Sequence, residues 1–443
     1  MNRRPSIAFG FLALIGVGAI LLASPWARVG SDGRWGDWLS ALFTACSAVC
    51  VTGLSIVEIG THFTFWGQVV LLVLVEIGCL GLMTCGTFLL IAVGRRLSLS
   101  REFSLMNAYG VAQVKGLRGL ICWVIGSMLF VETIGAIALY HYFGNVYESI
   151  FYSIMGFCNA GFGLEPDSLV SFSDSPYLVL VMASETILGG IGFLVLYNLC
   201  TCRFLNRSSG GRGRLTLHTR VVLRFTVYLL LIAFIAFLLS EWKGVLADMP
   251  FVKKLWVGFY QAVTPRTCGF CVTPTEDLNP LTRFIYVFLM FIGGAPGSAA
   301  AGMKVTTFAV LIYTWTAMCR GETETVISKR VIPTDIVRES IVILMALIAF
   351  VAVVTGILFV TEAEALRSSA TQIDALFFEA VSAITTTGLS VGSTTRDLSF
   401  AGKCVIMVAM FIGRLGALTV VMMIGDRESN RHIRFPTEEL VVG

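Results

Sequence analysis

Charge is the property that this sequence most conspicuously lacks. Only 14% of its 443 residues are Asp, Glu, Lys or Arg, whereas 56% are hydrophobic and the mean hydropathy is +0.82. A water-soluble domain rarely has so few charged residues, because its surface has to be solvated. The composition therefore excludes an ordinary soluble domain and favours a protein whose surface lies largely in lipid.

Groups that carry enzyme chemistry are also scarce. The chain has no Walker sequence for binding nucleotide phosphates, and its one Cys-x-x-Cys motif, Cys268 to Cys271, has no second pair to complete a metal site. The four histidines are scattered: His62, His141, His218 and His432. We therefore expect no enzyme, no organic cofactor and no nucleic-acid partner. A non-conducting scaffold would not need the repeated glycines described below.

Long apolar runs recur from one end of the chain to the other. They cover residues 7–23, 69–93, 120–140, 177–200, 221–239, 284–292 with a continuation past a Gly-rich break, 341–360 and 405–424. Most approach or exceed the ~20 residues that a helix needs to cross a bilayer. The first follows Arg3 and Arg4, as a signal peptide would, but lacks a persuasive cleavage site. The runs predict a polytopic protein surrounded by the lipid bilayer.

Four short segments resemble one another, and each contains a glycine followed by Leu or Phe. These glycines are separated by 108, 108 and 119 residues: Gly53, Gly161, Gly269 and Gly388. Before each lies an amphipathic stretch too short to cross a bilayer, at 38–49, 147–158, 256–264 and 373–383. After each comes a long span with a further glycine 24 to 28 residues beyond the first: Gly78, Gly189, Gly293 and Gly413.

This repeat predicts an all-α polytopic membrane protein made of four units. Each unit has a helix, a re-entrant half-helix with its loop, and a second helix. The expected units are 1–100, 101–208, 209–325 with an interrupted second span, and 326–430, before a cytoplasmic tail, 431–443. Irregular backbone cannot face lipid, because its N–H and C=O groups would be unsatisfied there. The four loops should therefore surround a pore with pseudo-four-fold symmetry.

The distribution of charge predicts the orientation. If the N-terminus and the linkers between units share one side, that side carries 20 of the 32 basic residues and 9 acidic residues, against 10 basic and 16 acidic residues on the other side. Basic residues concentrate in cytoplasmic loops. Both termini and all three linkers should therefore be cytoplasmic, and the four loops should enter the membrane from outside.

The loops have features of a cation filter. A partly dehydrated cation needs oxygens in place of its water, and rings of backbone carbonyls supply them. Glycine at positive φ lets successive carbonyls turn toward one axis, and the C-terminal ends of half-helices direct negative dipoles to the ion. One such loop alone would more simply be a turn or a packing contact. Four in register favour a permeation path.

A Gly-rich segment, Gly293 to Lys304, interrupts the third unit's second span. Its four glycines and one proline should break the helix. Such a break is tolerated in a membrane only beside a cavity or other protein. We expect a flexible barrier below the filter, with a passive kink as the alternative, and expect Lys304 at the cytoplasmic end of its helix.

Arg414 lies inside the apolar run 405–421. A permanent cation at membrane depth is costly and is by default a functional hypothesis. We expect it to act as an electrostatic plug near the cation path or to pair with an acid. Three glutamates within spans are candidate partners: Glu76, Glu132 and Glu185.

The loops, the Gly-rich break and the string Gly413-Arg-Leu-Gly416 together resemble the Trk/Ktr/HKT superfamily of potassium transporters over essentially the whole chain, in particular its KtrB-type subunits. The most characteristic strings are Ser47-x-x-Cys-Val-Thr-Gly-Leu54, Thr264-Pro-Arg-Thr-x-Gly-Phe270 and Gly293-Gly-x-Pro-Gly-Ser298. The resemblance implies a multi-pass protein of the bacterial cytoplasmic membrane, homodimeric with one pore per protomer. It also implies assembly on cytoplasmic nucleotide-binding KtrA-type subunits.

The resemblance also assigns site residues. Those matching the potassium filter are Cys50, Val51, Thr52, Gly53, Asn159, Ala160, Gly161, Arg266, Thr267, Cys268, Gly269, Thr385, Thr386, Thr387 and Gly388. Those matching the gate are Gly293, Gly294, Gly297, Ser298, Gly302 and the pore arginine Arg414.

The permeant ion implied is K⁺. In related plant transporters, serine at the first filter glycine goes with sodium preference, so Gly53 favours potassium. The second loop departs from the pattern, since Asn159-Ala160 stands where the first and fourth loops have Thr. Hydroxyl coordination is therefore not four-fold, which a filter of carbonyls tolerates. A sodium-selective or sodium-coupled transporter is the alternative.

Overall fold

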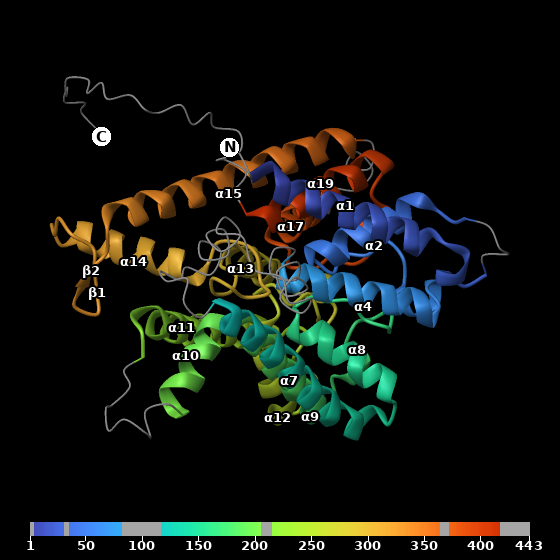
Figure 1. Cartoon of the computed structure of the whole chain (residues 1–443), viewed down its shortest axis with the longest axis horizontal. Coiled ribbons are helices and arrows are strands. Elements are labelled where there is room, and N and C mark those ends of the chain that lie inside the picture. The colour runs from blue at the N-terminus through green and yellow to red at the C-terminus, as the bar shows by residue number, and fades with distance from the viewer. Residues whose placement is uncertain (1–3, 31–34, 82–116, 205–214, 364–371, 417–443) are drawn as a thin grey trace.

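The computed structural model describes residues 4–30, 35–81, 117–204, 215–363 and 372–416 (Figure 1). Helices make up most of these residues. They are α1 Arg4–Ala23, α2 Trp38–Cys50, α3 Ile59–His62, α4 Phe65–Leu80, α7 Leu117–Phe143, α8 Val146–Phe157, α9 Pro176–Ile191, α10 Phe193–Phe204, α11 Leu217–Glu241, α12 Phe251–Val263, α13 Pro280–Phe291, α14 Val305–Cys319, α15 Thr334–Thr361, α17 Gln372–Thr385, α18 Thr394–Asp397 and α19 Phe400–Leu415. The strands are β1 Val326–Ile327 and β2 Arg330–Val331.

The β1–β2 hairpin corrects the all-α prediction in one place. The two strands pair antiparallel, with Val326 opposite Val331 and Ile327 opposite Arg330. The two turn residues, Ser328 and Lys329, have φ of 50° and 64°. Positive φ at both central residues is the geometry of a two-residue hairpin turn, and it usually requires Asn or Gly. Ser-Lys carries no such signal, so the sequence did not predict this hairpin.

Short helices occupy all four positions where half-helices are predicted: α2, α8, α12 and α17. Asp37 is the N-cap of α2, and its side chain accepts a hydrogen bond from the Leu39 N–H at 3.0 Å. Asn145 is the N-cap of α8, and its side chain accepts one from the Tyr147 N–H at 3.0 Å. Such caps satisfy N–H groups that a helix start leaves free. α12 begins five residues earlier than the predicted 256, directly after Pro250.

Helix packing closes into a ring. Each short helix packs against the long helix that precedes it, in the pairs α1–α2, α7–α8, α11–α12 and α15–α17. Each short helix also contacts the helix that follows the preceding loop, in the pairs α4–α8, α9–α12, α13–α17 and α19–α2. The last pair joins the end of the described chain to its beginning, and α19 lies near α1 and α2 in Figure 1.

The helix after each loop stops early. α4, α9 and α19 end before Gly81, Gly192 and Gly416, whose φ values are 77°, 92° and 84° and whose ψ values are 139°, 141° and 136°. Residues with a β-carbon are strongly disfavoured in this conformation, whereas glycine adopts it readily. The predicted continuous span at 177–200 is therefore wrong, because α9 and α10 meet at 92°. The predicted interruption between α13 and α14 is present.

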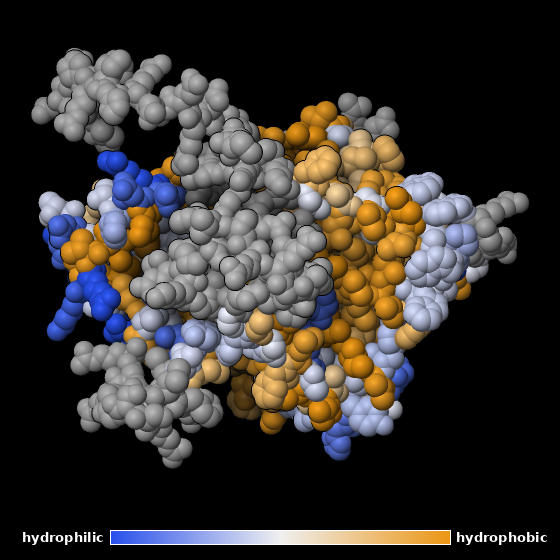
Figure 2. Space-filling view, viewed as in Figure 1, coloured by the Kyte–Doolittle hydropathy of each residue, from blue (hydrophilic) through white to orange (hydrophobic). Residues whose placement is uncertain are grey.

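Three described helices are long and apolar enough to cross a membrane: Ile121–Phe143, Leu217–Glu241 and Thr334–Thr361. The bent pair α9 and α10 would make a fourth span. Fewer helices pass than the eight predicted spans. The apolar parts of α1, α4, α13 and α14 are only 12 to 16 residues long, and the predicted runs 69–93 and 405–424 extend beyond the described residues. In Figure 2 a hydrophobic area lies right of centre, and hydrophilic residues gather at the left and right ends, as is typical of a protein embedded in lipid.

Candidate functional site

The four loops share an unusual backbone. Two residues before each loop glycine, φ is positive at a residue that has a side chain: 55° at Val51, 56° at Asn159, 65° at Thr267 and 50° at Thr386. The glycines themselves have φ of 91°, 72°, 81° and 85° in chain order. A β-branched residue in the left-handed region is a genuine outlier. Strain of this kind persists only where the surroundings hold it, commonly at ligand-binding sites.

The loop glycines follow one another round a closed ring in chain order. A β-carbon added to Gly53 would lie 3.1 Å from the Gly161 α-carbon, and one added to Gly161 would lie 2.8 Å from the Gly269 α-carbon. From Gly269 to Gly388 the corresponding distance is 3.5 Å, and from Gly388 back to Gly53 it is 3.3 Å. Four backbones meet here, with no room for side chains between them.

Carbonyl oxygens line this ring. Each glycine faces the carbonyl of the residue that precedes the next glycine: Ala160 for Gly53, Cys268 for Gly161, Thr387 for Gly269 and Thr52 for Gly388. The loop glycines and the carbonyls between them thus form one layer in which each loop contributes the same atoms. Such a layer can replace the hydration shell of a small cation.

Hydrogen bonds hold three loops in the same way. The N–H before the loop glycine donates to a carbonyl five residues earlier: Thr52 to Ser47 at 2.8 Å, Ala160 to Met155 at 2.9 Å and Thr387 to Ser382 at 2.8 Å. The third loop differs, because the Cys268 N–H donates four residues back to Thr264, at 3.1 Å. The loops therefore have closely similar supports, with one local exception.

Side chains of the loops bond to neighbouring parts of the protein. With its amide nitrogen turned toward the Gly156 and Thr186 carbonyls, Asn159 donates to both, at 3.0 and 3.2 Å. The Thr385 and Thr387 hydroxyls are 2.8 Å apart and bond to each other. Asn159 thus supports its loop at the position that Val51 occupies in the first loop and Thr386 in the fourth.

Among the residues matched to the filter, Arg266 has a side chain that bonds to the Gly-rich segment. Its side chain is buried, and its Nη2 donates to the Gly293 carbonyl at 3.3 Å, at the start of the Gly-rich segment. Its Nε has no hydrogen-bond partner in the described part of the chain. Arg266 therefore links the third loop to the segment below.

A cavity of about 540 Å³ lies directly over the ring, and all four loop glycines line it. Acidic side chains surround it: Glu58, Glu165, Asp167 and Glu276. One basic residue, Arg396, also lines it and pairs with Glu58 at 3.1 Å. Four acids and one base give a net formal charge of −3, which raises the local concentration of cations.

The Gly-rich segment packs against the break between α9 and α10. Ala295 N–H donates to the Gly190 carbonyl at 2.9 Å, and Phe193 N–H donates to Gly297 at 2.9 Å. A β-carbon at Gly192 would lie 2.9 Å from the Pro296 carbonyl. Gly192 is not among the residues predicted from the sequence. The signal that could have found it is the spacing Gly-x-x-Gly, shared by residues 78–81, 189–192 and 413–416.

Arg414 of α19 also contacts the Gly-rich segment, at a different point from the α9–α10 break. Its Nη1 donates to the Ala299 carbonyl at 2.7 Å, and its Nη2 donates to the Gly78 carbonyl and, at 3.4 Å, to Cys79. Within the described ranges, the expected acidic partner is wrong: no carboxylate bonds to Arg414, because backbone carbonyls at the end of α4 and in the segment take its donors. The guanidinium thereby joins α19, α4 and the Gly-rich segment.

Lys304 lies at the start of α14, and its Nζ donates to the Ala300 carbonyl at 2.5 Å. It therefore lies at the N-terminal end of its helix, next to the Gly-rich segment, and its position on the cytoplasmic side stays a prediction.

Comparison with known proteins agrees with this architecture. The model of the TrkH family, described as cation transport protein, matches residues 19–431. Ktr system potassium uptake protein B of Bacillus subtilis (strain 168) is 36% identical over 99% of this chain and 96% of its own. Potassium/sodium uptake protein NtpJ of Enterococcus hirae is 32% identical over the same shares.

A solved structure shows the same fold. The potassium transporter TrkH from Vibrio parahaemolyticus superposes with a TM-score of 0.74, covering 96% of this chain and 86% of that chain at 17% sequence identity. The family model covers nearly all of the chain, and the named relatives match it end to end. The chain belongs to the TrkH family of cation transport proteins, a family of transporters rather than enzymes.

Proposed function

We propose that this chain is the pore-forming subunit of a potassium uptake system. K⁺ passes through a filter of backbone carbonyls at residues 50–53, 159–161, 266–269 and 385–388. The four loops belong to four repeated units, 1–100, 101–208, 209–325 and 326–430, arranged with pseudo-four-fold symmetry. The observation that carries the proposal is the closed ring of four left-handed glycines at the floor of an acid-lined cavity.

Potassium is favoured over sodium for two reasons. A ring without side chains leaves only carbonyls for the ion, and the first ring position is Gly53 rather than serine. The relatives reported above are named for potassium uptake, although one of them is named for potassium and sodium. That name supports the second candidate, a sodium-selective or sodium-coupled transporter of the same fold.

The Gly-rich segment is the proposed gate. It contacts Arg266 beside the filter, the α9–α10 break on one side and Arg414 on the other. The positive guanidinium of Arg414 adds an electrostatic barrier for cations. Opening requires the segment to give up hydrogen bonds, and its glycines at positions 293, 294, 297 and 302, with Ser298, allow the backbone to move.

The chain is proposed to work in a larger assembly. Names of the relatives place them in Ktr systems, which supports cytoplasmic nucleotide-binding KtrA-type partners for this chain. We further propose a homodimer in the bacterial cytoplasmic membrane with both termini in the cytoplasm, on the strength of the charge asymmetry.

Expression in a bacterium that lacks its own potassium uptake tests the function. We expect growth at low external K⁺, and stronger growth when a KtrA-type subunit is co-expressed. Growth that requires added Na⁺ would favour the sodium-coupled candidate. Failure to grow with the protein present in the membrane, with and without the partner, would contradict potassium uptake.

A further inference from the structure

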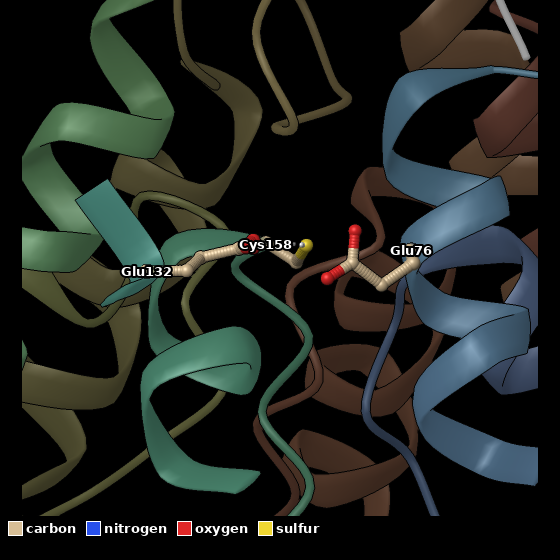
Figure 3. Close-up of side chains that lie close together, drawn as sticks. All are labelled: Glu76, Glu132 and Cys158. Atoms are coloured by element: carbon tan, nitrogen blue, oxygen red, sulfur yellow. Dashed lines mark hydrogen bonds between the residues drawn. The ribbon is translucent and has the colours of Figure 1, made fainter. Parts of the chain in front are cut away.

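Three side chains with metal-binding atoms meet outside the filter: Glu76 from α4, Glu132 from α7 and Cys158, the residue that ends α8. One ligand atom from each lies within 4.8 Å of the others. Figure 3 shows the Glu76 carboxylate turned toward Cys158 and the Glu132 side chain directed at the same point.

The carboxylates of this cluster have no counter-charge. Glu132 is only 5% exposed, and the one hydrogen bond to its carboxylate from any described residue comes from the Cys158 thiol, at 3.8 Å. No basic side chain in the described ranges pairs with Glu76 or Glu132. Two carboxylates so close together in apolar surroundings cannot both stay ionised unless a cation lies between them. A cation bound between them or a proton shared by them would relieve this repulsion.

We propose that this cluster binds a thiophilic divalent cation of the Zn²⁺ type, with Glu76, Glu132 and Cys158 as ligands. Zinc takes carboxylate oxygens and thiolates in tetrahedral sites, whereas Mg²⁺ and Ca²⁺ prefer oxygens alone. Zinc bonds of about 2.0 Å to oxygen and 2.3 Å to sulfur place tetrahedral ligand atoms about 3.5 Å apart. Small side-chain rotations bring the present atoms to that spacing.

A cavity borders the two carboxylates. Glu76 and Glu132 line a space of about 460 Å³ that extends along α7 to Tyr140 and reaches Val146 at the start of α8. Both Tyr140 and Val146 are exposed. The two carboxylates therefore border a space that none of the four loop glycines lines.

A metal ion bound at this site should slow transport, because it would link parts of the protein that have to move relative to one another. Cys158 directly precedes Asn159 of the second filter loop, and Glu76 lies on α4, whose Gly78 carbonyl accepts a hydrogen bond from Arg414. A metal bound to Cys158 and Glu76 would join filter and gate supports rigidly. This effect on flux rests on the proposed function, whereas binding of the metal does not.

Cd²⁺ titration of the purified full-length protein tests the binding, read from the ultraviolet band of cadmium–thiolate bonds. We expect one ion per chain, displaced by Zn²⁺. Glu132→Gln and Cys158→Ser should each weaken binding at least about tenfold, since they remove a ligand. Cys122→Ser, which removes an exposed cysteine of α7, should bind as the wild type does. Binding that is absent, or equal in Glu132→Gln and wild type, would overturn the site, leaving the carboxylates to share a proton.

Ion flux in liposomes tests the consequence. External Zn²⁺ should slow flux through the wild type and Cys122→Ser, and the half-inhibiting concentration should rise at least about tenfold in Glu132→Gln. Equal inhibition of Glu132→Gln and wild type would overturn the inhibitory role. A wild type without flux in the absence of Zn²⁺ would instead count against the proposed function, and the Cd²⁺ titration would still decide the site.

Discussion

Gly53→Ser should lower the ratio of potassium to sodium permeability at least about tenfold, a loss of about 1.4 kcal/mol in discrimination. Gly53 has φ +91°, and a β-carbon there would press on the Ala160 carbonyl and lie 3.1 Å from the Gly161 α-carbon. The neighbours are backbone rather than flexible side chains, so the ring itself has to distort. The spacing that matches one ion and not the other is then lost.

Permeability ratios in liposomes with opposed K⁺ and Na⁺ gradients provide the measurement. Gly126→Ser is the matched control, since a β-carbon at Gly126 on α7 meets nothing within 4 Å. Gly388→Ala repeats the test on the other side of the ring, where the β-carbon meets the Thr52 carbonyl. Wild-type ratios in stably folded Gly53→Ser and Gly388→Ala proteins would refute the filter assignment.

Deleting residues 299–302 should raise flux about tenfold, within the 5- to 150-fold range of typical coupling energies. The deletion removes the Ala299 carbonyl that Arg414 holds and the Ala300 carbonyl that Lys304 holds. It also shortens the segment that bridges the α9–α10 break and α19. The closed arrangement then loses its attachments, and the barrier below the filter weakens.

Arg414→Ala separates this gate from a general loss of structure. If the hydrogen bond from Arg414 to Ala299 keeps the gate closed, either change alone raises flux, and the double variant gains less than the product of the two effects. Partners in one contact behave non-additively, unlike distant sites. Flux that stays the same or falls in a deletion variant inserted at wild-type levels would exclude the gate.

The sequence predicted the parts of the molecule that depend on glycine. Only glycine fits where four backbones meet at positive φ. The ring therefore requires glycines at regular intervals in the sequence, at positions 53, 161, 269 and 388. The half-helices follow from their length, because an apolar stretch of that size cannot cross a bilayer. Both features could be predicted from the sequence alone.

Other features of the structure have no signal in the sequence. Val51, Thr267 and Thr386 adopt left-handed backbone conformations that their β-branched side chains disfavour, so local preference predicts the opposite. The surrounding hydrogen bonds impose these conformations, and those bonds depend on the tertiary structure. Arg414 is a similar case. The free-energy cost of a charged residue in lipid could be predicted from the sequence, but its carbonyl partners could not. They depend on where α4 ends, which is set by Gly81, a residue without a predicted role.

The permeant ion's position tests the central claim most directly. Structures of the full chain in Rb⁺ or Tl⁺, with anomalous scattering to locate the ion, would show which atoms hold it. The account predicts a peak inside the ring of Gly53, Gly161, Gly269 and Gly388, coordinated by backbone carbonyls of all four loops. It also predicts that Gly53→Ser weakens that peak. An empty ring, or ions held elsewhere by side chains, would contradict it.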